Sequence, residues 1–155
     1  MTEGREMSGT NLIFRILSKL QSDDPVSRDE GASEAADWFE SGHLSEGHYK
    51  TLVQELLAKG TAEPDPVAKE SLFNALSSAS MCAMNQTINW EPVTRAIAGL
   101  DLQCLEHALV ILGFSKNPKY RSEIERYLTH PDPDICRIAA ESLEENRASP
   151  ARRSV

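Results

Sequence analysis

The stretch HPDPDICRIAAESL at residues 130–143 decides the fold of this 155-residue chain. It places Asp132 and Pro133 directly before a run in which apolar residues such as Ile135 and Ala139 recur at helical spacing. An aspartate oxygen accepts hydrogen bonds from the free N–H groups of a helix's first turn, and its charge suits the positive end of the helix dipole. A proline loses nothing there, because its missing N–H would have no partner. The stretch therefore predicts a capped, amphipathic helix.

The same signal recurs along the chain. Aspartates that precede a helical pattern stand at positions 24, 65, 101 and 132, so the intervals between them are 41, 36 and 31 residues. Three of the four are followed by proline, and Asn117-Pro118 is a neutral version of the same cap. Another apolar stripe precedes each capped helix, at residues 11–21, 45–59, 90–98 and 118–129. Thr10 or Asn11 is the expected cap of the first stripe, and Gly60 the expected end of the second. No segment alternates with the period of a strand, so the sequence predicts an all-α protein of about four helix pairs.

Residues 130–143 resemble the second helix of a HEAT repeat, and EPDPVAKESL at residues 63–72 resembles it less completely. The resemblance extends over residues 10–146. It implies a right-handed α-solenoid of antiparallel helix pairs, in which the second helices line a concave face. The unit at Asp24 departs from the pattern because Gly31 lies inside its helix, and the unit at Asp101 lacks the proline and the basic residue.

We expect one helical-repeat domain at residues 10–146, between a flexible segment at residues 1–9 and a disordered basic tail at residues 147–155. Residues 77–92, rich in small and polar side chains, either extend the preceding helix or form a long loop. The N-terminus has no signal-peptide pattern and no apolar run approaches membrane-spanning length, so a cytoplasmic protein is expected. Cys82, Cys104 and Cys136 form no metal-binding or disulfide pattern and are expected to be reduced.

The charge of the chain is strongly acidic. The net charge is −8, and without residues 147–155 the remaining 13 basic and 24 acidic residues leave about −11. This charge opposes nucleic-acid binding, which needs cations to meet phosphates. It favours a basic protein partner, because complementary fields speed encounter. Acidity that serves only solubility is the alternative.

Catalytic patterns are absent from the sequence. The four histidines form no metal-binding or acid–base constellation, and there is no nucleophile elbow or phosphate-binding glycine loop. Glu106 and His107 are adjacent and therefore point in different directions on their helix. We therefore expect a protein that is not an enzyme and that has no cofactor and no metal. A monomer is the favoured oligomeric state, which the sequence does not determine.

Trp38 and Trp90 are either core residues or interface anchors, since tryptophan is favoured at both kinds of position. The second helices, which line the concave face by resemblance, carry most of the candidate partner-binding residues. After removal of the apolar stripes, the predicted partner-binding set is Glu34, Asp37, Trp38, Glu70, Asn74, Glu106, His107, Glu141 and Glu144. A solvated helix face is the alternative for each of them.

Small acidic HEAT-like chains include bacterial immunity proteins. This analogy implies an immunity or inhibitor protein that binds and neutralises a basic partner, such as a toxin domain. The alternatives are a scaffold or accessory protein of the kind that attaches or detaches bilin chromophores, and a regulatory adaptor. A nucleic-acid-processing enzyme resembling the HEAT-like DNA glycosylases is disfavoured by the charge. We expect neither a nucleic-acid nor a membrane partner.

Overall fold

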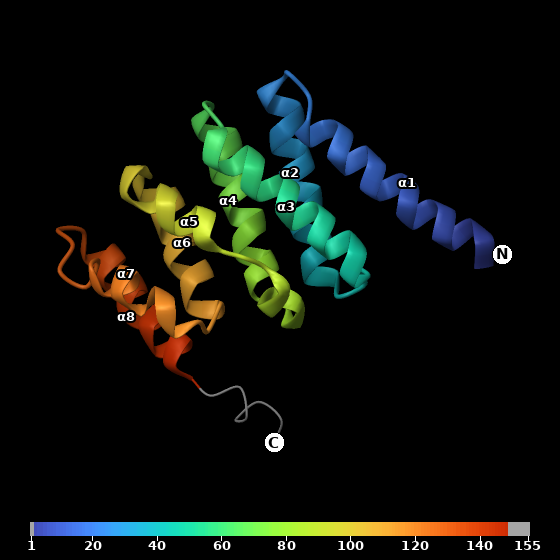
Figure 1. Cartoon of the computed structure of the whole chain (residues 1–155). Coiled ribbons are helices and arrows are strands. Elements are labelled where there is room, and N and C mark those ends of the chain that lie inside the picture. Colours follow the sequence, from blue (N-terminus) through green and yellow to red (C-terminus); the bar gives the residue numbers. More distant parts are fainter. Residues whose placement is uncertain (1, 149–155) are drawn as a thin grey trace.

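The computed structural model describes residues 2–148, with side chains described for residues 9–148 (Figure 1). Within residues 2–148 the chain forms eight α-helices and no strand, which confirms the all-α prediction. The helices are α1 (Thr2–Leu20), α2 (Pro25–Ser41), α3 (Glu46–Ala62), α4 (Pro66–Ser80), α5 (Glu91–Ala96), α6 (Leu102–Phe114), α7 (Arg121–Glu125) and α8 (Pro133–Arg147). Three short 3-10 helices join them: η1 (Ala83–Thr87), η2 (Ile97–Gly99) and η3 (Pro118–Tyr120).

The four predicted aspartate caps are confirmed. Asp24 accepts a hydrogen bond from the N–H of Val26 at 3.1 Å, and Asp65 accepts one from Ala68 at 2.9 Å. Asp101 and Asp132 cap α6 and α8 in the same way, at 2.9 and 2.8 Å. Each cap fixes the first residue of its helix, so the repeated dipeptides set where the second helix of each pair begins.

The helices lie in two layers. The first layer holds α1, α3, α5 and α7, and the second holds α2, α4, α6 and α8 (Figure 1). In the second layer α2 packs against α4, α4 against α6, and α6 against α8; in the first layer α1 packs against α3 and α3 against α5. One apolar cluster fills the space between the layers, from Ile13 in α1 to Leu143 in α8. Within residues 2–148, no helix is long and apolar enough to cross a membrane.

Two glycines allow helices to approach closely. A Cβ on Gly31 of α2 would lie 2.9 Å from the Cβ of Lys19 in α1. A Cβ on Gly113 of α6 would lie 2.8 Å from the carbonyl oxygen of Ser142 in α8. The glycine inside α2, which departs from the repeat pattern, therefore serves the packing of α1 on α2.

Some predicted boundaries are wrong. The first helix begins at Thr2, so Thr10 and Asn11 lie inside it and do not cap it. Gly60 does not end α3, which continues to Ala62; Gly60 is buried against Leu72 of α4. The predicted helix at 118–129 is shorter, because tight i-to-i+3 turns such as Tyr127 N–H to Ile124 O replace the α-helical pattern after residue 125.

The irregular stretch at residues 77–92 both extends the preceding helix and forms a connecting segment, which are the two alternatives that the sequence left open. It extends α4 to Ser80, then forms η1 and an extended segment leading to Trp90. The buried amide of Asn85 holds it in place by donating to the carbonyl oxygens of Ser80 and Phe114, each at 2.6 Å. Because Phe114 ends α6, this one side chain links the segment to both neighbouring second-layer helices.

Candidate protein-binding surface

Charge is divided between the two layers. Over residues 2–148, α2, α4, α6 and α8 carry eleven acidic and four basic residues, a net charge of −7, whereas α1, α3, α5 and α7 carry seven of each. The side of the second layer that points away from the first layer is called the open face here. On α2 its exposed positions recur at helical spacing, as at Val26, Ser33, Asp37 and Glu40. The acidity of the chain is therefore concentrated on one layer.

The acids of α2 point in three directions. Glu34, a predicted partner-binding residue, turns toward α1, where it lies 2.6 Å from Lys19 Nζ and 3.7 Å from Arg15 Nε. Asp29 accepts a hydrogen bond from the Ser71 hydroxyl of α4. Asp37 is exposed on the open face and has no ion-pair or hydrogen-bond partner among residues 9–148. Of these acids, Asp37 is the one most available to a partner.

The structure brings Glu70 and His107 together across α4 and α6. The His107 Nε2 atom lies 2.8 Å from a carboxylate oxygen of Glu70, and both side chains are partly exposed. Asn74 is exposed one turn after Glu70, and Glu106 is half-buried beside His107. The sequence placed these residues on one surface, but the direct contact between two helices could not be read from residue spacing.

On α8, Glu141 lies 3.2 Å from Arg137 within the same helix, and Glu144 is exposed. Glu145 lies 2.9 Å from Lys116 Nζ, which also donates to the backbone carbonyl of Glu145 at 2.8 Å. Glu141 and Glu145 border a hollow of about 240 Å³ between α6 and α8, whose apolar walls are Val110, Phe114 and Ile138. This hollow could not be read from residue spacing, because its walls come from two helices that lie side by side only in the folded chain.

Trp90 is a core residue, 1 % exposed. Trp38 is half-buried: it packs against the core and also lines a larger cavity of about 470 Å³. This cavity lies where α2 and α4 end and α3 and η1 begin. Its walls are mostly apolar: Trp38, Phe39, Leu44, Tyr49, Met81, Cys82 and Met84, together with Gly42, Ser78, Ala83 and Glu40. The Tyr49 hydroxyl is already engaged, since it donates to the Ala79 carbonyl at 2.7 Å.

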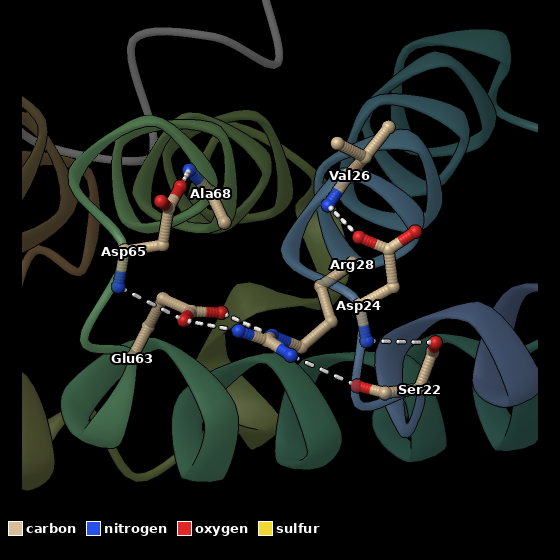
Figure 2. Close-up of polar contacts among 7 residues, drawn as sticks. All are labelled: Ser22, Asp24, Val26, Arg28, Glu63, Asp65 and Ala68. Carbon is tan, nitrogen blue, oxygen red and sulfur yellow. Dashed lines mark hydrogen bonds and ion pairs between the residues drawn. The ribbon is translucent and has the colours of Figure 1, made fainter.

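A buried ion pair supports the first two second-layer helices (Figure 2). Arg28 of α2 donates through Nε and Nη2 to the two carboxylate oxygens of Glu63, at 2.5 and 2.8 Å, and through Nη1 to the Ser22 carbonyl at 2.9 Å. Glu63 also accepts from the Asp65 N–H at 3.2 Å. The hydrogen bond from Arg28 is the main cause that lowers the pKa of Glu63 below its usual value, and the one from Asp65 adds to it. Burial of the carboxylate acts in the opposite direction and raises the pKa. The pair orients both capped helix starts, and residue spacing does not reveal it because its two members lie 35 residues apart.

The three cysteines are free thiols. Burial is the main cause that raises the pKa of Cys104 to about 12, as expected for a small apolar side chain between stacked helices. Among the described residues, no group of three or more histidine, cysteine or acidic side chains is arranged to hold a metal ion.

Comparison with known proteins finds no family model, no curated protein and no solved structure that matches this chain.

Proposed function

We propose that this chain is a non-enzymatic binding module that captures a basic protein through the open face of α2, α4, α6 and α8. The observation that carries the proposal is the division of charge: a net −7 on the second layer against zero on the first. An acidity that served only solubility would have no reason to favour one layer. A layer with this net negative charge attracts and orients a positively charged partner.

The contacts of the open face support this proposal. Asp37 of α2 and Glu144 of α8 have no ion-pair partner among residues 9–148, so a partner can use their charges without breaking existing contacts. Glu40, another residue of this face, is positioned by a neutral group of the next helix, the Ser78 hydroxyl at 3.4 Å. Such hydrogen bonds orient the carboxylate and leave its charge in place.

A HEAT-like solenoid is part of the same proposal. Its support is the recurrence of the aspartate cap at the start of α2, α4, α6 and α8, and the packing of each of these helices on the next. In such an arrangement each helix pair contributes a strip to one continuous surface.

Within this class we favour an inhibitor of the immunity-protein kind, which neutralises a basic toxin domain by covering its positively charged surface. A compact acidic layer suits that task, because a nuclease or other phosphate-binding toxin must display cations around its active site.

The test measures binding of the full chain to a short arginine-rich synthetic peptide by fluorescence anisotropy. The variant Asp37→Asn/Glu106→Gln/Glu144→Gln removes three negative charges from the second layer. The matched control, Glu46→Gln/Glu55→Gln/Glu123→Gln, removes the same charge from the first layer.

We expect the second-layer variant to weaken binding and the control to leave it nearly unchanged. Binding should also weaken as salt rises from about 50 to about 150 mM. Equal effects of the two variants would show that only the total charge matters, and the assignment to the open face would then be wrong.

A further inference from the structure

We infer that the cavity at the ends of α2 and α4 receives an apolar side chain of a basic partner, with cations of the same partner lying beside it. This inference rests on the proposed function and adds a specific anchor site to it. The cavity volume of about 470 Å³ lies within the range of sites that enclose small organic groups.

The walls of the cavity suit a side chain that enters from outside. Met81 is 53 % exposed although it lines the cavity, and Met84 and Trp38 are half-buried. An exposed methionine beside a tryptophan forms an apolar surface whose contact with water is unfavourable. Methionine is also flexible and polarisable, so it adapts to the shape of an incoming group. Filling the cavity would remove this surface from water.

The charges around the cavity point to a cationic partner. Glu40 is the only charged residue among the lining residues of this cavity, and it is exposed. One turn earlier on α2, Asp37 adds a second exposed carboxylate. No lysine or arginine contributes to the walls. An apolar anchor flanked by arginine or lysine would therefore find opposite charges next to the cavity.

The C-terminal ends of α2 and α4 add to the negative charge beside the cavity. The C-terminus of a helix carries partial negative charge, and a lysine or arginine in the last turn usually complements it. Neither α2 nor α4 has a basic residue in its last turn, whereas α3 ends with Lys59 and α8 with Arg147. The two helix ends that meet at the cavity therefore lack a cation of their own, as the end of α6 also does, and a partner can supply one beside the cavity.

The experiment compares three short synthetic peptides on the full-length chain. The first has arginines on both sides of a central phenylalanine. The second has serine at the centre, and the third keeps the phenylalanine but replaces the arginines by glutamates. Binding is followed by anisotropy and by NMR of the chain labelled with ¹³C in its methionine methyl groups. Met81 and Met84 report on the cavity.

We expect the arginine–phenylalanine peptide to bind about tenfold or more tightly than the serine peptide, equivalent to about 1.4 kcal/mol. The methyl signals of Met81 and Met84 should shift with the first peptide and not with the second. Ala83→Trp, which fills the cavity from an exposed lining position, should abolish the advantage of phenylalanine. Ala58→Trp, at an exposed position on α3, should preserve it.

The outcomes separate the two proposals. Equal, salt-sensitive binding of both arginine peptides with unmoved methionine signals would overturn the anchor site and leave the proposed function standing. Binding of the glutamate-flanked peptide as tightly as the first would overturn the basic partner, and with it both proposals. Failure of both arginine peptides to bind at low salt would also overturn both.

Discussion

Arg28 and Glu63 lie 35 residues apart in the chain, yet they form a two-point ion pair in which the Glu63 side chain is only 1 % exposed. The Arg28 guanidinium also donates a hydrogen bond to the Ser22 carbonyl, so it joins the α1–α2 turn to the α3–α4 turn. A planar guanidinium matches a carboxylate at two points, which lysine cannot do. The pair therefore fixes the relative position of the first two second-layer helices.

Loss of Arg28 should be costly, because it leaves a buried carboxylate without a counter-charge. We expect Arg28→Ala to lower the thermal unfolding midpoint by several degrees, and Arg28→Lys to recover only part of the loss. The measurement is thermal unfolding followed by circular dichroism. Arg137→Ala is the matched control, since its partners Asp134 and Glu141 are exposed and it should change the midpoint little. Equal effects of Arg28→Ala and Arg137→Ala would show that the buried pair contributes no more than a surface pair.

The same pair predicts a pH dependence of stability. The pKa of Glu63 is lower in the folded chain than its unfolded value of 4.5, so the folded state holds the proton less tightly. The pair's contribution is thus complete above that value and is lost as the pH falls through the lower folded-state pKa. Urea unfolding across this acid range should show a smaller loss of stability for Glu63→Gln than for the unchanged chain. If both lose stability in parallel, other carboxylates account for the acid sensitivity.

Gly113 should not tolerate a methyl group. The alanine Cβ would lie 2.8 Å from the Ser142 carbonyl oxygen and 3.0 Å from the Ser142 Cα, both backbone atoms that cannot rotate away. We expect Gly113→Ala to destabilise the fold by about 1–3 kcal/mol, because α6 and α8 must separate. Gly47→Ala is the control: nothing lies within 4 Å of its Cβ position, and reduced freedom of the unfolded chain should stabilise the protein by up to about 1 kcal/mol. Urea unfolding measures both, and a neutral Gly113→Ala would contradict the close approach of these helices.

Asp101 caps α6 without a following proline, so its substitution measures the contribution of the aspartate alone. Its carboxylate accepts the Cys104 N–H at 2.9 Å, and Asp101→Ala leaves that donor without a partner. We expect a loss of about 1 kcal/mol in the free energy of unfolding, with Asp101→Asn nearly neutral because asparagine caps equally well. A similar loss for asparagine would indicate that the charge, rather than the hydrogen bond, is what matters at this helix start.

Local chemistry explains which parts of the fold could be predicted. The caps at Asp24, Asp65, Asp101 and Asp132 act within three residues of themselves, so the dipeptide alone reveals them. Gly60 shows the limit of this reasoning: its sequence context is typical of a helix end, but packing against α4 keeps it inside α3.

The candidate site was predictable in its composition and not in its geometry. The acids of the second helices follow from the helical period, yet whether Glu34 faces α1 or the open face depends on where Lys19 lies. The cavity beside Met81 combines the ends of two helices with the starts of two others, and no single segment shows it. Contacts of this kind, like the pair of Arg28 and Glu63, depend on how distant segments are brought together.

The division of charge between the layers has a consequence for how a partner arrives. With a net charge of zero on one layer and −7 on the other, the centre of negative charge is displaced from the middle of the molecule toward the second layer. The molecule is therefore an electric dipole whose axis crosses both layers. In the field of a positively charged body, such a dipole experiences a torque that turns its acidic side forward before any atoms touch, within a screening length of about 8–10 Å. Orientation then precedes collision, and a larger share of encounters begins with the correct side facing the partner.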